Sequence, residues 1–95
     1  MSAEDIIKYL AVFNKDDRLN VWHIALLVTI LYLGHMQGQR RIINVSRSKL
    51  MKISHINTLP TYHKYINEIQ RFGYIKYSPS YHPGYKSSVQ LLIEP

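Results

Sequence analysis

Apolar residues recur at helical spacing near the start of the chain. They are Ile6, Ile7, Leu10 and Phe13. Steps of three and four residues place side chains on one face of a helix. Ser2 is a suitable N-cap, and Glu4 and Asp5 follow it where the helix dipole favours anions. The pattern predicts an amphipathic helix over residues 2–14, followed by a polar connector.

A second helix is expected over residues 20–37, with Asn20 as its N-cap. Apolar residues surround this helix on nearly every side. It should therefore pack on several faces, or on one face against a second copy of the protein. Its apolar run covers only residues 21–33, whereas a spanning helix needs about 20 residues, so we expect a core helix and no membrane span. Gly34 and Gly38 are expected at its fraying end and the following turn.

The middle of the chain predicts a strand and a short helix. Ile42, Ile43 and Val45 favour a strand too short to stand alone. Ser46 is a suitable N-cap for a helix over residues 47–54. The residues of this helix expected to face inward are Leu50, Met51 and Ile53.

A further helix is expected over residues 59–72, after a turn at 55–58. Pro60 lies in its first turn, where the missing N–H costs nothing. Its apolar stripe comprises Leu59, Tyr62, Ile66, Ile69 and Phe72. Gly73 is expected to end the helix as a C′ residue.

The remaining pattern predicts a hairpin. Residues 74–77 and 89–93 have strand composition, and the loop 78–87 between them contains two Pro and one Gly. The order of elements predicts an α+β, winged helix-turn-helix domain. It has a mostly helical three-helix core, a small antiparallel β-hairpin wing and an extra N-terminal helix. We expect one domain over 1–95, with the helix-turn-helix at 46–73 and the wing at 74–93.

Positive charge is concentrated in the second half of the chain. From Arg40 to Lys86 there are nine Lys and Arg residues and one acid, Glu68. The rest of the chain holds three cations and five acids, so a +8 segment is attached to a −2 remainder. A cationic segment on a fold that presents a helix indicates a polyanionic duplex as partner.

The outer face of the helix at 59–72 carries the candidate base contacts. Its members are Thr61, His63, Lys64, Asn67, Glu68 and Arg71. Asn67 can pair with adenine, and Arg71 or Lys64 can reach guanine or a phosphate. Thr58 and Thr61 suit phosphate or thymine-methyl contacts, and Glu68 can accept from cytosine or repel phosphate. The alternative is a solvated surface with a stabilising Lys64–Glu68 pair.

The preceding helix and the loop supply candidate backbone contacts. Arg47, Lys49 and Lys52 suit phosphates, as do Arg40 and Arg41. In the loop, Tyr81, His82 and Lys86 suit the DNA backbone. The alternative for Tyr81 and Tyr85 is a small cluster that packs on the hairpin.

The residue types argue against other functions. There is no Cys, and the five His residues have no zinc-ligand spacing, so we expect no metal or other cofactor. No catalytic motif is present, so we expect no enzyme, and no small-molecule ligand is evident. A basic chain without Cys fits a reducing cytoplasm, and the start of the chain is acidic, unlike a signal peptide.

Three motifs carry a resemblance to a known family. They are S-x-x-x-L-x-x-x-S at 46–54, T-Y-x-K-x-I-x-x-I at 61–69 and G-Y-I-x-Y at 73–77. The segment 46–89 resembles the winged helix-turn-helix domains of bacterial transcription regulators and replication-initiation proteins. The resemblance is strongest to short, stand-alone proteins associated with mobile elements. It implies that residues 59–72 form the recognition helix, although the Pro-containing loop has few cations for a wing of this family.

We therefore expect a small transcriptional regulator that binds double-stranded DNA. A single module presents a limited surface, which favours a homodimer, with the first and central helices as its interface. One alternative is a protein-interaction adaptor. The other is a non-specific or replication-associated DNA binder. Only DNA binding should weaken steeply with salt, and only a specific reader should prefer a sequence.

Overall fold

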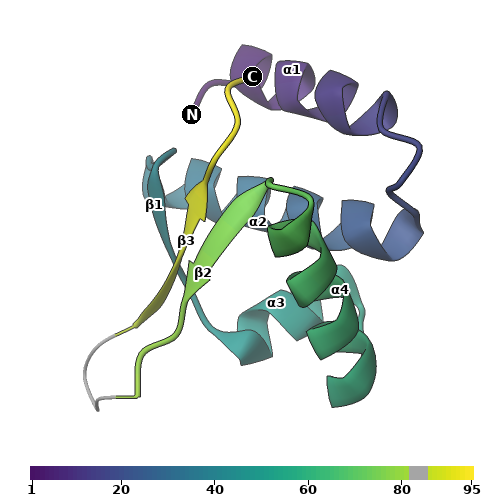
Figure 1. The fold of residues 1–95 in the computed structure, drawn as a ribbon. Helices are drawn as coiled ribbons and strands as arrows, with labels where there is room; N and C mark the ends of the chain where they lie inside the picture. The colour runs from purple at the N-terminus through teal and green to yellow at the C-terminus, as the bar shows by residue number, and fades with distance from the viewer. Residues whose placement is uncertain (82–85) are drawn as a thin grey trace.

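The computed structural model describes residues 1–81 and 86–95. The helices in this part are α1 (Ala3–Asn14), α2 (Val21–Gln37), α3 (Arg47–Ser54) and α4 (Leu59–Arg71). The strands are β1 (Ile42–Val45), β2 (Ile75–Ser78) and β3 (Ser87–Leu91). The fold is therefore α+β, as predicted. Figure 1 shows α1 on one side of α2, with α3 and α4 on the other.

Local capping sets the starts of three helices. The side chains of Ser2 and Asn20 accept backbone N–H groups of α1 and α2. Ser46 Oγ accepts from the Lys49 N–H of α3 at 3.1 Å. These bonds satisfy N–H donors that have no partner at a helix start, which is why the helices begin at short polar residues. All three predicted N-caps are confirmed.

The sheet has three antiparallel strands in the order β1-β3-β2. The short strand predicted around residue 43 does not stand alone, because it pairs with β3, where Ile43 lies opposite Val89. Both side chains are buried. The predicted hairpin is thus part of a larger sheet, and β3 is its central strand.

Glutamine side chains cover parts of both outer strands. Gln37 Oε1 accepts the Asn44 N–H at 2.9 Å, and its Nε2 donates to the Asn44 oxygen at 2.7 Å. On the other edge, Gln70 Oε1 accepts the Tyr77 N–H at 3.2 Å. Each amide takes the place of a neighbouring strand. Exposed strand edges pair readily with other chains, so these contacts limit edge-to-edge association.

The core is organised around α2. Leu26, Leu27 and Ile30 are fully buried, and α2 packs against α1, α3, α4 and β1. Gly34 lies inside this helix and is buried, not at a frayed end as predicted. A Cβ there would lie 2.8 Å from Ile43 Cδ1, so glycine permits the close approach of α2 to β1. Across 1–81 and 86–95, no helix is long and apolar enough to cross a membrane.

Several apolar side chains predicted on inward helix faces are exposed. On α1, Ile7 and Leu10 are 66% and 38% exposed. Leu59 is 44% exposed and Ile53 is 37% exposed. Leu59 is the first residue of α4, and Ile53 is next to the last residue of α3. Periodicity assigns a face to each residue, but a helix end can extend beyond the surface against which its centre packs.

The turn between α3 and α4 depends on one left-handed residue. His55 has φ 63° and is the only non-glycine residue with positive φ in the described ranges. Histidine occupies this region more readily than most residues, although at a cost relative to glycine. The conformation lets α3 end at Ser54 and reverses the chain into α4.

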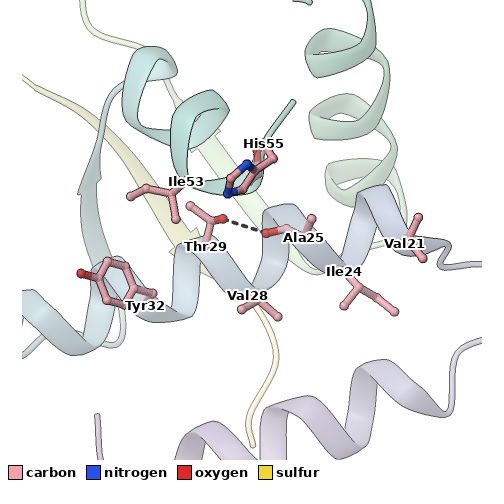
Figure 2. Close-up of a pocket in the computed structure, with 9 residues that line it drawn as sticks. Val21, Ile24, Ala25, Val28, Thr29, Tyr32, Ile53 and His55 are labelled. Carbon is pink, nitrogen blue, oxygen red and sulfur yellow. Dashed lines mark hydrogen bonds between the residues drawn. The ribbon is translucent and has the colours of Figure 1, made fainter. Parts of the chain in front are cut away.

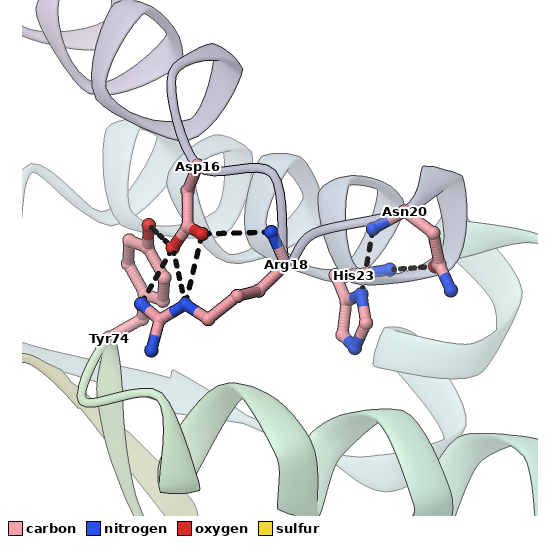
Figure 3. Close-up of polar contacts among 5 residues, drawn as sticks. All are labelled: Asp16, Arg18, Asn20, His23 and Tyr74. Atoms are coloured by element: carbon pink, nitrogen blue, oxygen red, sulfur yellow. Dashed lines mark hydrogen bonds and ion pairs between the residues drawn. The ribbon is translucent and has the colours of Figure 1, made fainter.

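A polar cluster ties the α1–α2 connector to the end of α4 and the start of β2 (Figure 3). The Arg18 guanidinium donates twice to Asp16, through Nε at 3.0 Å and Nη2 at 2.7 Å. The Tyr74 hydroxyl donates to Asp16 Oδ2 at 2.6 Å. Arg18 also lies over the Phe72 ring, 4.6 Å from its centroid. The cluster therefore connects segments 58 residues apart.

We expect Asp16→Asn to destabilise the protein at neutral pH. The hydrogen bonds from Arg18 and then Tyr74 hold the pKa of Asp16 well below its ordinary value of 3.8. A lowered pKa stabilises the folded state above pH 3.8, and this contribution is lost as pH falls toward the folded-state pKa. The gap between wild type and variant in urea-unfolding midpoint should therefore narrow below pH 3.8.

Asp17→Asn is the matched control for this titration. Asp17 is adjacent and exposed, and it forms no ion pair within the described ranges. It should leave the midpoint nearly unchanged. Equal effects of the two substitutions would contradict the role of the cluster, as would a difference in midpoint between wild type and Asp16→Asn that stays constant down to pH 2.

The same cluster affects Tyr74. Burial and the hydrogen bond to Asp16 raise the pKa of the Tyr74 hydroxyl to about 12.

Candidate nucleic-acid interface

The exposed face of α4, the start of α3 and the hairpin border one groove. Figure 1 shows α3, the start of α4 and the loop end of the hairpin at the end of the molecule away from α1. The groove has a volume of about 820 Å³. The predicted contact residues that line it are Arg47, Lys49, His63, Asn67, Tyr81 and Lys86. The fold thus brings together residues from three separate segments of the sequence.

The other predicted contact residues lie outside the groove lining. Lys52, Thr58, Lys64 and Arg71 are exposed, and Thr61 is partly buried. His82 lies outside the described residues. The exposed positions on α4 form one arc of the helix, because His63, Asn67 and Arg71 are four residues apart. This arc is opposite the buried stripe of Tyr62, Ile66 and Ile69; those three predicted core positions are confirmed.

Glu68 was predicted to lie on this arc, but it does not. Its Oε1 is 2.8 Å from His23 Nε2, and His23 is almost completely buried. His23 Nδ1 accepts the Asn20 N–H at 2.9 Å, as Figure 3 shows, so the ring proton is on Nε2 and is donated to Glu68. The predicted Lys64–Glu68 pair is replaced by a contact with α2. The carboxylate is thereby held against the core side of α4.

The cations of this region have no acidic partners. Within 1–81 and 86–95, ion pairs with Lys or Arg join Lys8 to Glu4, Arg18 to Asp16 and Arg40 to Glu94. The cations of α3, α4 and the hairpin that have no carboxylate within 4 Å in the same ranges are Arg47, Lys49, Lys52, Lys64, Arg71, Lys76 and Lys86. Glu68 contacts His23 and forms no ion pair with these cations in the described ranges.

The start of α4 has no side-chain cap. Thr58 is the N-cap residue, but its hydroxyl makes no bond to the backbone of the first turn. Thr58 Oγ1 instead donates to Thr61 Oγ1 at 2.9 Å. Uncapped N–H groups at a helix start carry partial positive charge. They add to the positive potential of the exposed side of α4.

Tyr62 was predicted only as a core residue, yet it lines the groove. Its hydroxyl is buried and has no hydrogen-bond partner among the described residues. Burial raises the pKa of Tyr62 above its ordinary value of 10.0. The ring packs edge-on against His63, with 5.4 Å between centroids. Nothing in its helical spacing distinguishes such a tyrosine from an ordinary core aromatic residue.

The described residues contain no group of three or more His, Cys, Asp or Glu side chains that could hold a metal ion. Comparisons with protein-family models, with curated proteins and with solved structures found no match for this chain.

Proposed function

We propose that this chain is a winged-helix protein that binds double-stranded DNA in a sequence-specific manner and acts as a small transcriptional regulator. One observation carries the proposal: the groove face combines cations from α3 and the hairpin with the polar arc of α4, and among the described residues Glu68 contacts His23 and none of these cations. Cations without carboxylate partners around an exposed helix suit a polyanion.

In this proposal, α4 is the recognition helix and enters the major groove, which is about 12 Å wide and admits one helix. Asn67 lies in the middle of the exposed arc, where its amide can donate to N7 and accept from N6 of adenine. Arg71 and Lys64 reach guanine or phosphate from the same helix. Base edges would thus be read from α4 alone.

Affinity for the DNA backbone would come from the flanking elements. Arg47 and Lys49 lie in the first turn of α3, beside the groove. Lys86 and Tyr81 reach the groove from the hairpin, which would act as the wing. Contacts of this kind position a protein on the duplex and carry no sequence information.

Selection from a random duplex pool, with retention followed across a salt series, tests the proposal. An enriched motif whose retention falls with salt supports a specific reader. Retention without a motif would replace it with a non-specific DNA binder. Failure to retain any duplex at low salt would reject DNA binding and favour the adaptor alternative.

One substitution on α4 and one on α3 should separate base contacts from phosphate contacts. Asn67→Ala is expected to reduce preference for one base position about tenfold, with little change on unrelated duplexes. Lys52→Ala is expected to weaken binding to all duplexes alike. It should also reduce the slope of log affinity against log salt concentration by about one unit. Binding to the selected site and to a scrambled site measures both effects. Equal losses for both variants on both duplexes would contradict base reading by Asn67.

A further inference from the structure

A stripe of apolar side chains along α2 has no covering in the described chain. The stripe comprises Val21, Ala25, Val28, Tyr32 and Met36. Val21 and Met36, near its two ends, are 72% and 65% exposed. Val28 and Tyr32 between them are 41% and 49% exposed. Large exposed apolar surfaces mark sites of association.

The part of the stripe from Val21 to Tyr32 lines an apolar groove of about 580 Å³. Figure 2 shows that Val21, Ile24, Val28 and Tyr32 come from α2, whereas Ile53 at the end of α3 and His55 in the following turn border the groove from the other side. This explains the exposure of Ile53, which was predicted to be inside: it faces a groove that the described chain leaves open.

The spacing of the stripe is that of a helix–helix contact. Its residues are separated by four, three, four and four positions. Alternating steps of three and four keep one seam of a helix facing a partner helix. The seam extends along nearly all of α2, over about 24 Å at 1.5 Å per residue. An occupant must therefore be an elongated apolar element of similar length.

The order of side chains fits a second copy of α2 in antiparallel orientation. A two-fold axis beside Val28 would place Val21 opposite the partner's Met36, and Ala25 opposite the partner's Tyr32. The smallest residue of the seam thus faces its largest, and the two Val28 side chains meet near the axis. Two-fold interfaces require such self-complementarity, because the same patch is used by both subunits.

The absence of charge on α2 agrees with a second copy. No Asp, Glu, Lys or Arg occurs in α2, so two chains of net charge +6 can meet here without bringing like charges together. The seam offers roughly 250 Å² in projection, for a face about 24 Å long and about 10 Å wide. A standard interface buries about 800 Å² per partner. The seam is about a third of this size, so the expected dimer is weak.

We propose that the exposed stripe of α2 is a homodimer interface, formed by antiparallel pairing with α2 of a second copy. The proposal does not depend on DNA binding. It differs from the expectation drawn from the sequence in its geometry, because the groove is lined by α2 and the end of α3 and not by α1.

Sedimentation velocity from 1 to 500 µM, without DNA, tests this interface. The wild type should pass from monomer to dimer, and Val28→Glu should raise the dissociation constant about 100-fold by opposing two carboxylates at the axis. Ile42→Glu is the control, since Ile42 is 61% exposed on β1 and lies outside the groove. A wild type that stays monomeric throughout, or equal effects of both substitutions, would overturn the proposal.

Cysteine cross-linking tests the register, because the chain has no Cys of its own. Val28→Cys should oxidise to a covalent dimer, whereas Ile42→Cys should not. Ala25→Cys mixed with Tyr32→Cys should cross-link, while each alone should not, since like positions are offset by about 10 Å along the axis. Efficient cross-linking of Ala25→Cys to itself would overturn the antiparallel arrangement.

Discussion

The double variant Arg47→Ala/Lys49→Ala is expected to bind double-stranded DNA about 30-fold more weakly at 0.15 M salt. Both side chains lie in the first turn of α3, border the groove and have no carboxylate partner within the described residues. Each phosphate contact releases about 0.9 counterion. At this salt concentration, one such contact raises the binding constant by a factor of about five. Fluorescence anisotropy across a salt series should also show a slope shallower by about 1.8.

Lys8→Ala/Lys15→Ala is the matched control, because it removes the same charge from α1 and its end. Lys8 pairs with Glu4 at 3.6 Å, and neither lysine lines the groove. We expect less than a twofold change in affinity, since exposed charges more than about 10 Å from DNA are largely screened. Equal losses in the two double variants would show that only net charge matters. Unchanged affinity of the Arg47→Ala/Lys49→Ala variant would show that this face does not contact DNA.

His23→Ala is expected to lower the free energy of unfolding by about 3 kcal/mol. The substitution leaves the Asn20 N–H without its acceptor and the Glu68 carboxylate without its donor. It also removes a ring that packs 4.9 Å from Tyr65 and 5.4 Å from Phe72 between centroids. Urea unfolding measures the loss directly, and the melting temperature should fall by about 15 °C.

Two variants separate the contributions of His23. His23→Gln keeps an acceptor at the third helical position, as a capping box requires, but loses the ring, so an intermediate loss is expected. Glu68→Gln keeps an oxygen acceptor for His23 Nε2 and should cost less than about 1 kcal/mol. It should also change DNA affinity less than twofold. A large gain in DNA affinity would contradict the inward position of Glu68.

Local signals predicted much of the fold. Ser2, Asn20 and Ser46 were identified as caps because a cap contacts only the next two or three residues. The inward positions of Tyr62, Ile66 and Ile69 followed from helical period alone. Gly73 has φ 86°, as expected of a residue that ends a helix.

Long-range contacts account for the predictions that were wrong. Glu68 was assigned to the outer face of α4 because its partner, His23, is 45 residues away in the sequence. Gly34 was assigned to a fraying end because its neighbour in space is Ile43, on another element. No periodicity or propensity of the segment itself carries these contacts.

The candidate interface was predictable in part. Charge counting located the cationic region, and helical period selected the exposed side of α4. The groove itself was not predictable, because it requires α3, α4 and the hairpin to be placed relative to each other. Tyr62 and Gln37 line it without having been predicted as contacts, since their side chains reach the groove only through tertiary packing.

By itself, the sequence determined where helices begin and end, which side of α4 is polar and which half of the chain is cationic. These properties arise from interactions among residues a few positions apart and from composition. Only the tertiary structure decided that β1 joins β3, that Glu68 turns onto His23, and that one stripe of the apolar helix α2 stays uncovered. Those outcomes depend on how much apolar surface each neighbouring element can bury, which no single segment specifies.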